Sequence, residues 1–318
     1  MSDAAIEMKG AGSGPLPLSE PQDLSEVRDW LVLLKPRVIS LVVLTGIAGL
    51  LVAPGHLPPA LAIAAVLCIA TAAGAAGAIN MWYDRDIDAV MRRTASRPIP
   101  AGRIRPGSAL GFGVALATGA VLVMGLATNW VAAGVLALSV GFYVLVYTIW
   151  LKRRTPQNIV IGGAAGAFPP VIGWAAVTGQ VTLEPLVLFA IIFFWTPPHF
   201  WSLSLFAHAD YARAGVPMLP VVAGARETRR QVLLYTLLLV PLSLAPVALG
   251  FAGALYGAVA AVLGAGFLWH ALRVWRDAQD PTGRSLTNDL PAKRAFKYSI
   301  SYLFVLFAAL PVDRLLLG

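Results

Sequence analysis

The 318-residue chain contains few charged residues and almost no cysteine. Charged side chains make up 13% of the residues, against about a quarter in an average soluble domain, which argues against a soluble protein. The single cysteine, Cys68, lies inside an apolar run, so an intramolecular disulfide framework is excluded. The stability of this fold must therefore come mainly from apolar packing.

What the chain has instead is long apolar runs. Hydrophobic residues make up 58% of it, and the mean hydropathy is +0.74. Runs long enough to cross a hydrocarbon core of about 30 Å recur, and each must be helical because a lipid-exposed backbone has to satisfy its own hydrogen bonds. The sequence predicts nine transmembrane helices, over residues 38–57, 60–83, 108–127, 130–151, 158–178, 184–206, 231–250, 252–272 and 296–316.

We expect a single all-α membrane domain over residues 31–318, preceded by a disordered cytoplasmic tail over residues 1–30. The tail lacks the basic and then apolar run of a signal peptide, and its acidic residues are unlike a mitochondrial presequence. The net charge is +8, which by itself would suggest nucleic acid as a partner. With the N-terminus inside and nine crossings, however, every Lys and Arg except Arg314 falls on the cytoplasmic side. The positive-inside rule explains this asymmetry, so we expect no nucleic-acid binding, and a C-terminus on the outer side.

An acidic motif lies at the cytoplasmic end of the second predicted helix. Asn80, Asp84 and Asp88 follow the pattern N-x-x-x-D-x-x-x-D. Residues four apart lie on roughly one face of a helix, about 6 Å from one another, whereas Asp86 falls near the opposite side. Two carboxylates and an amide oxygen on one face are hard ligands of the kind that Mg²⁺ uses alongside substrate phosphates. Taken alone, the motif is equally compatible with acidic residues that cap a membrane helix at the water line.

Basic residues follow this motif and recur at the end of the fourth predicted helix. Arg93 and Arg97 lie in the loop after the aspartates, and Lys152 and Arg153 lie just beyond Tyr147. Guanidinium groups match phosphate oxygens bidentately, and a lysine can bind a diphosphate as a point charge. The positive-inside rule and snorkelling side chains at the interface explain the same residues without phosphate binding.

A second polar cluster ends the sixth predicted helix. Pro197 and Pro198 remove two backbone donors and are expected to kink the helix. His199 follows them, and a histidine within an apolar segment is a functional candidate, although it could instead bond a carbonyl that the kink frees. Asp210 could complete a metal site or cap a short helix.

These stretches resemble the UbiA superfamily of intramembrane prenyltransferases, and more narrowly its haem-farnesylating members. The likeness runs from about Leu34 through the last helix, and the narrower part of it rests on residues 84–98, 147–158, 198–201 and 210–220. The resemblance implies a bundle of nine transmembrane helices around a central cavity that opens to the cytoplasmic side, in a bacterial inner membrane. In one respect the chain departs from the superfamily: Asp210 has no acidic partner four residues away, so a second D-x-x-x-D motif is missing.

The resemblance also implies a reaction. A farnesyl group would pass from farnesyl diphosphate to a vinyl group of haem B with addition of water, giving haem O, with Mg²⁺ as cofactor, membrane lipid as surroundings and haem A synthase as a downstream partner. The roles it implies are metal binding by Asn80, Asp84, Asp88 and Asp210, catalysis by Asp84, Asp88, Lys152 and Tyr147, diphosphate binding by Arg93, Arg97, Lys152 and Arg153, and haem binding by His199.

Two other functions remain compatible with the sequence. The first is a UbiA-type prenyltransferase whose acceptor is an aromatic acid or a quinone precursor. The second is a secondary transporter, in which intramembrane charges and proline-broken helices are usual. Transporter sites lie near the bilayer midplane, whereas the acidic residues here map to the cytoplasmic ends of helices, and this favours an enzyme.

Overall fold

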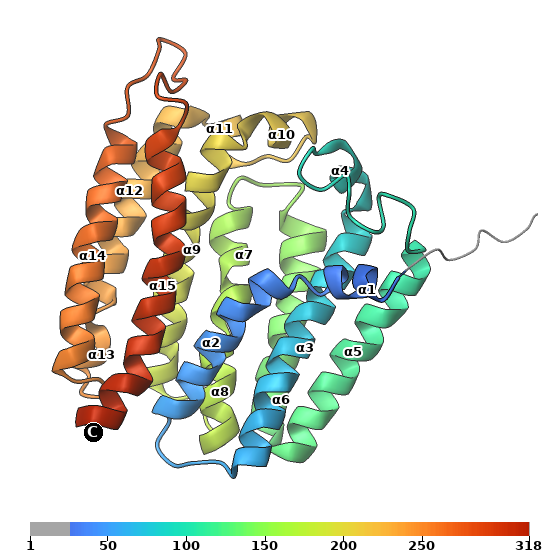
Figure 1. Ribbon diagram of the computed structural model, residues 1–318, viewed down its shortest axis with the longest axis vertical. Helices are drawn as coiled ribbons and strands as arrows, with labels where there is room; N and C mark the ends of the chain where they lie inside the picture. The colour runs from blue at the N-terminus through green and yellow to red at the C-terminus, as the bar shows by residue number, and fades with distance from the viewer. Residues whose placement is uncertain (1–25, 318) are drawn as a thin grey trace, which may run out of the picture.

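The computed structural model describes residues 26–317, which form a bundle of long helices (Figure 1). The helices before the middle of the chain are α1 (Val27–Leu33), α2 (Pro36–Val52), α3 (Pro59–Tyr83), α4 (Arg85–Val90), α5 (Pro106–Ala127), α6 (Trp130–Gly141), the π-helix η1 (Phe142–Leu151), α7 (Asn158–Ala167) and α8 (Pro169–Thr178). They are followed by α9 (Leu183–Phe206), α10 (His208–Arg213), α11 (Leu219–Val222), α12 (Gly224–Leu242), α13 (Ala245–Ala248), α14 (Ala254–Trp275) and α15 (Leu290–Leu317). The predicted all-α architecture is confirmed.

The candidate membrane crossings are close to the predicted number. Within residues 26–317, eight helical segments are long and apolar enough to span a membrane, some of them made of two consecutive helices. The predicted ninth crossing corresponds to α2, whose apolar part, Ile39–Val52, is shorter than these segments. Two of the helices begin earlier than hydropathy predicts, at Gly224 and Leu290, because their first turns carry arginine and lysine that extend out of the apolar run.

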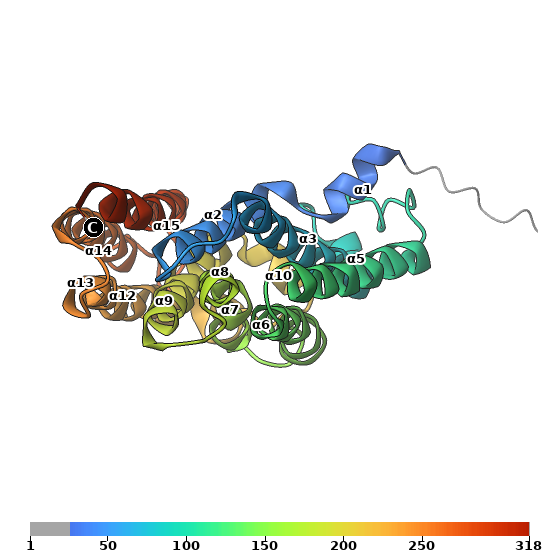
Figure 2. The same ribbon diagram turned by 90° about the horizontal axis from the view of Figure 1, so that it is seen from below.

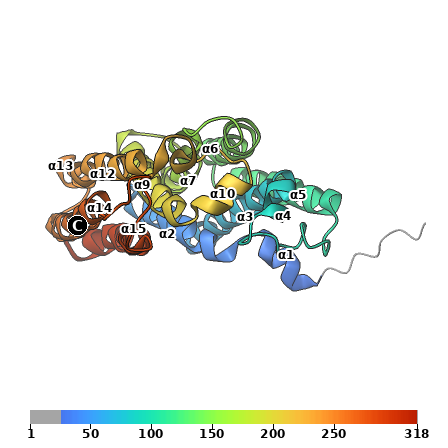
Figure 3. The ribbon, with the colours of Figure 1, turned by 90° about the horizontal axis from the view of Figure 1, so that it is seen from above.

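The bundle is flattened, with two rows of helices. Seen from below and from above, α2, α3 and α5 lie along one side, α6, α7, α9 and α12 lie along the other, and α14 and α15 close one end (Figures 2 and 3). The short helices α4, α10 and α11 lie at the same end of the bundle (Figure 1). This end also carries the basic loops, which the positive-inside rule predicts to be cytoplasmic.

Glycine allows two helices on opposite sides to meet closely. A Cβ atom on Gly49 of α2 would lie 2.1 Å from the carbonyl oxygen of Pro170, and one on Gly173 of α8 would lie 2.1 Å from the carbonyl oxygen of Gly46. Small residues permit such backbone contact between membrane helices, where dispersion forces have to replace the hydrophobic effect. This contact joins the two rows of helices in the half of the bundle away from α4, α10 and α11 (Figure 1).

The first helix lies across the bundle rather than along it (Figure 1). Asp29 accepts a 2.9 Å hydrogen bond from Arg103, and the Trp30 ring contacts the Phe112 ring edge-on at 4.9 Å. The chain then turns into α2 at Lys35, whose φ of 54° is left-handed, with Pro36 as the first helical residue. These contacts place Lys35 against the inner end of α3. The predicted tail over residues 1–30 overlaps α1 at residues 27–30, and its residues 1–25 lie outside the described residues, so that part of it stays a prediction.

Candidate active site

The acidic motif spans the junction of α3 and α4. Asp84 ends α3 and precedes α4, and backbone hydrogen bonds from Asp84 to Asn80 (2.9 Å) and from Asp88 to Asp84 (2.8 Å) keep the helical spacing through the junction. Asp84 is 0% exposed and Asp88 2%. The Asn80 amide donates to Asp84 Oδ2 at 2.6 Å. Buried carboxylates are costly unless they are paired, so their partners define the site.

Each buried carboxylate has a cation that the sequence had singled out. Lys152 donates to Asp84 Oδ2, and Arg97 binds Asp88 Oδ2 at 2.6 Å. The Lys152 pair joins the end of η1 to the end of α3, 68 residues away, and the Arg97 pair joins α4 to the segment that follows it. The structure thus brings the predicted aspartates together with two of the predicted phosphate-binding residues.

A third cation was not anticipated from the sequence. Lys35 donates from Nζ to Asn80 Oδ1 at 2.9 Å and also lines the central cavity. Burial, together with the positive charges of Arg97 and Lys152, lowers the pKa of Lys35 to about 7. The sequence offers only a weak signal for this role, a lysine directly before a proline at a helix start. We call Lys35, Asn80, Asp84, Asp88, Arg97 and Lys152 the charged end.

The π-helix η1 supplies a further support for this cluster. Its wider turn pairs the Lys152 amide with the Tyr147 carbonyl at 2.9 Å, and the Thr148 hydroxyl donates to the Tyr143 carbonyl at 2.8 Å. The same hydroxyl accepts a 3.2 Å hydrogen bond from the Asn80 amide. π-Helical turns occur often at functional sites, and this one turns Tyr143, Tyr147, Thr148 and Lys152 toward the bundle interior.

Three predicted site residues lie differently from this group. Arg153 makes two hydrogen bonds of 2.7 Å to Asp86, and its guanidinium also lies 3.5 Å from Asp84 Oδ1, so it links the surface to the buried pair. The Asp86 side chain is 62% exposed, in keeping with its predicted place outside the aspartate pair. Asp210 in α10 pairs with Arg213 at 3.3 Å. Arg93 has an exposed side chain that lines the cavity. The predicted roles of Arg153, Asp210 and Arg93 stay predictions.

The donor set fits a magnesium ion. Asp84 Oδ1 is buried without a hydrogen-bond donor in the described part of the chain, although the Arg153 guanidinium lies 3.5 Å away. Magnesium takes one or two carboxylates and leaves its other positions to water and substrate phosphates. Within residues 26–317, no three His, Cys, Asp or Glu side chains gather closely enough to hold a metal by themselves. Asp84 and Asp88 would therefore share the ion with a ligand's phosphates.

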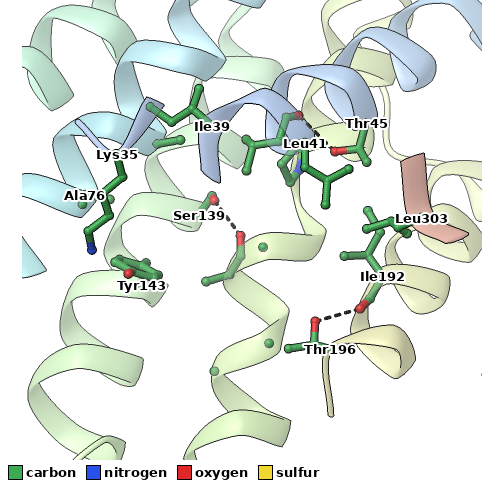
Figure 4. A pocket seen from close by; sticks show the side chains of 18 of the residues that line it. Lys35, Ile39, Leu41, Thr45, Ala76, Ser139, Tyr143, Ile192, Thr196 and Leu303 are labelled. Carbon is green, nitrogen blue, oxygen red and sulfur yellow. Dashed lines mark hydrogen bonds between the residues drawn. The ribbon is translucent and has the colours of Figure 1, made fainter. Parts of the chain in front are cut away.

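A largely apolar cavity of about 530 Å³ lies beside the charged end. Figure 4 shows Lys35 and Tyr143 on one side of it and Ile192, Thr196 and Leu303 on the other. Helices α2, α3, α7, α9 and α15 and the π-helix η1 contribute its lining. A cavity of this kind suits a ligand with a long apolar part and an anionic head.

Aromatic side chains from α9 and α15 form another part of the lining. The His199 ring is stacked between Trp195, at 4.3 Å, and Phe296, at 4.7 Å, and Phe200 meets it edge-on at 5.2 Å. Its Nδ1 lies 2.7 Å from the Ser299 hydroxyl. The helix α9 continues through Pro197 and Pro198. We call Trp195, His199, Phe200 and Phe296 the aromatic wall.

The arrangement suits the binding of a lipid-like anion within the membrane, and comparison with known proteins specifies the class of protein. Residues 42–310 match the UbiA prenyltransferase family, and the chain belongs to this family. It is 71% identical to the protoheme IX farnesyltransferase of Acidiphilium cryptum, with 90% of each chain covered. It is 65% identical to the protoheme IX farnesyltransferase of Granulibacter bethesdensis, with 99% of each chain covered.

Solved structures share the fold. A solved structure from work on digeranylgeranylglyceryl phosphate synthase superposes with a TM-score of 0.72 at 18% sequence identity, and the match covers 90% of this chain and 98% of that one. A UbiA homologue from Archaeoglobus fulgidus, bound to GPP and Mg²⁺, gives 0.62 at 18% identity, covering 89% and 99%. The predicted family and its multi-pass helical bundle are thus confirmed.

Proposed function

We propose that this protein transfers the farnesyl group of farnesyl diphosphate to a vinyl group of haem B. The observation that carries the proposal is the charged end, where three cations surround two buried carboxylates at the margin of an apolar cavity. The full-length relatives named for the same reaction, at 65% and 71% identity, support the choice of acceptor.

The charged end would bind the diphosphate. Breaking the allylic carbon–oxygen bond leaves the electron pair on the diphosphate, and positive groups fixed at that point lower the barrier because they need no reorganisation. Lys35, Arg97 and Lys152 are held there by their partners, and Arg93 reaches the cavity from the loop. When Asp84 and Asp88 bind the metal ion of the incoming ligand, their present partners Lys152 and Arg97 would be free to bind phosphate oxygens.

Asp84 and Asp88 would hold Mg²⁺ with the diphosphate, and Asn80 and Asp210 are further candidates for its coordination. When bound, the ion would neutralise charge on the leaving group. The solved UbiA homologues with Mg²⁺ and GPP or DMAPP support this cofactor. The rings of Tyr143 and Tyr147 line the cavity, and their π faces would stabilise the allylic cation.

The acceptor completes the reaction. The vinyl π electrons form the new carbon–carbon bond with the farnesyl cation, the positive charge moves to the neighbouring vinyl carbon, and water adds there and releases a proton. The products are haem O and diphosphate. His199 in the aromatic wall would contact the haem, and haem A synthase would take the product further. We place the protein in a bacterial inner membrane with its charged end and N-terminus toward the cytoplasm and its C-terminus outside.

Incubation of the purified protein with haem B, farnesyl diphosphate and Mg²⁺, followed by mass analysis of the pigment, tests the proposal. We expect a product heavier than haem B by one farnesyl group and one hydroxyl group, and no product without Mg²⁺. Formation of a prenylated phenolic compound from an aromatic acceptor, with haem B left unchanged, would contradict the choice of acceptor and favour another UbiA activity.

A further inference from the structure

One hydrogen bond of the aromatic wall decides which nitrogen of His199 carries a proton. The Ser299 oxygen lies 2.7 Å from the Phe296 carbonyl and 2.7 Å from His199 Nδ1. The hydroxyl has one hydrogen, so when it donates to the carbonyl its oxygen accepts from Nδ1–H, and the lone pair of the neutral ring is on Nε2. When it donates to Nδ1 instead, the proton of the ring is on Nε2.

The surroundings of the ring leave one part of it accessible. Trp195 covers one face, Phe296 covers the other, and Ser299 occupies Nδ1, yet His199 lines the cavity. Ser299 is the only hydrogen-bond partner of this ring in the described part of the chain. Phe200 meets another part of the ring edge, but Nε2 is not among the fully buried polar atoms that lack a partner within residues 26–317, so this nitrogen keeps some accessible surface at the cavity. Stacking between aromatic rings and burial also favour the neutral form of an imidazole, which is the form that binds a metal.

Ser299 is itself fixed from both sides. Its carbonyl accepts a 2.8 Å hydrogen bond from the Trp195 indole, while its hydroxyl bonds the Phe296 carbonyl and His199. One residue of α15 thus orients two rings of α9. A histidine that binds a metal usually donates its other N–H to a neighbouring oxygen, which fixes the ring and raises its basicity. His199 Nδ1 and the Ser299 oxygen, 2.7 Å apart, are placed for this arrangement.

We infer that His199 Nε2 coordinates the iron of the bound haem and that Ser299 is the positioning residue that sets its tautomer and direction. The inference rests on the proposed function, because it takes haem as the acceptor. A bond from Nε2 to the iron would hold the porphyrin plane roughly perpendicular to the direction in which Nε2 points. The vinyl groups at the porphyrin edge would then be kept at a fixed distance from the aromatic wall, which limits how the acceptor can turn toward the charged end.

Titration of the full-length protein with haem B and with iron-free protoporphyrin IX tests the iron bond directly. For His199→Ala we expect the Kd for haem B to rise roughly 100-fold and the Kd for protoporphyrin IX to change less than about twofold. The absorption spectrum of bound haem should lose its histidine-ligated form, and added imidazole should restore it. An equal loss for both porphyrins would show that His199 only packs against the ring, and no loss for haem would equally overturn the inference.

The serine has a matched pair of variants. Ser299→Ala removes the acceptor of the Nδ1 proton and should raise the Kd for haem B about tenfold, whereas Ser299→Thr keeps a hydroxyl and should restore most of the affinity. Farnesyl diphosphate binding serves as the folding control and should be unchanged in all three variants. Wild-type protein that makes no farnesylated haem would refute the proposed function. If the wild-type protein makes farnesylated haem, and His199→Ala still binds haem B more tightly than protoporphyrin IX by the wild-type ratio, the iron coordination alone would be refuted.

Discussion

The charged end and the aromatic wall are built in opposite ways. The charged end draws Lys35, Asn80, Arg97 and Lys152 from four separate segments, and they are joined by ion pairs and hydrogen bonds around buried carboxylates. The aromatic wall comes from two helices, α9 and α15, and is held by ring stacking and by the hydrogen bonds of Ser299.

This difference predicts how each region responds to change. Removing one partner of a buried ion pair leaves an uncompensated charge, so a single substitution in the charged end should cause a large loss of activity or stability. Substitution in a packed aromatic cluster has graded effects, because neighbouring rings can partly refill the space. Substitutions in the two regions should also weaken the binding of different substrates. Changes in the charged end should affect the diphosphate, and changes in the aromatic wall should affect the porphyrin.

The largest effect is expected for Asp84→Asn. The amide keeps the shape of the side chain but removes the charge opposite Lys152 and a buried carboxylate oxygen that has no hydrogen-bond donor within residues 26–317. We expect kcat to fall roughly 10³-fold, as when a group that stabilises transition-state charge is lost. Steady-state kinetics with farnesyl diphosphate measures the fall, and haem B titration of the same variant should match wild type. Loss of haem binding together with activity would mean that the two regions are not separate.

The sequence predicted the parts of the charged end that lie within one helical stretch. The spacing of Asn80, Asp84 and Asp88 is enough to place them on one face, and the same rule placed Asp86 outside. Local periodicity could not reveal Lys35, because its position depends on how α1 crosses the bundle. It could not reveal Thr148 either, because α-helical spacing does not anticipate the π-helix.

The aromatic wall shows the same limit. His199 was found because a histidine after a proline pair is unusual in an apolar helix. Its partner Ser299 is 100 residues away in the sequence and belongs to α15, where nothing in the local pattern marks it. Hydropathy therefore predicted the helices and their order, while contacts between distant helices, which depend on side-chain packing, required the structure.

A glycine next to η1 offers the next largest effect. A Cβ atom on Gly162 would lie 2.1 Å from the Tyr147 ring, so Gly162→Ala should displace this ring and destabilise the protein by about 1–3 kcal/mol. Thermal unfolding in detergent measures the change. Gly166 lies one turn further along α7 with no atom within 4 Å of a Cβ, so Gly166→Ala is the matched control and should leave the unfolding temperature unchanged or raise it. Equal unfolding temperatures for the two variants would mean that the Tyr147 contact does not constrain η1.

A smaller effect is expected where a single hydrogen bond orients the charged end. Thr148→Val keeps the shape of the side chain but removes the hydroxyl that joins Asn80 to Tyr143. A net hydrogen bond contributes about 1 kcal/mol, so kcat/KM for farnesyl diphosphate should fall about five- to tenfold. Thr148→Ser keeps the hydroxyl and should remain close to wild type. If the serine variant is as slow as the valine variant, packing of the methyl group, rather than the hydrogen bond, positions Asn80.

The smallest effect tests the edge of the charged end, where Asp86 binds Arg153 at the surface. Hydrogen bonds from the Arg153 guanidinium hold the pKa of Asp86 below its ordinary value. A carboxyl whose pKa is lowered in the folded state stabilises the protein above its unfolded pKa and loses that contribution as the pH falls through the folded pKa. The Asp86 side chain is 62% exposed, so water and salt weaken the pair. Asp86→Asn should therefore lower the unfolding temperature by about 1 °C or less at pH 7.

The pH dependence separates this surface pair from the buried ones. The difference between Asp86→Asn and wild type should shrink as the pH is lowered below the ordinary range of an aspartate, because the wild-type carboxyl then becomes protonated as well. Activity at pH 7 should stay within about twofold of wild type, since Asp86 is exposed and Arg153 keeps its contact with Asp84 without it. A large loss of activity at neutral pH would instead place Asp86 and its arginine inside the charged end, and the boundary drawn between Arg153 and the two cations Lys152 and Arg97 would have to move.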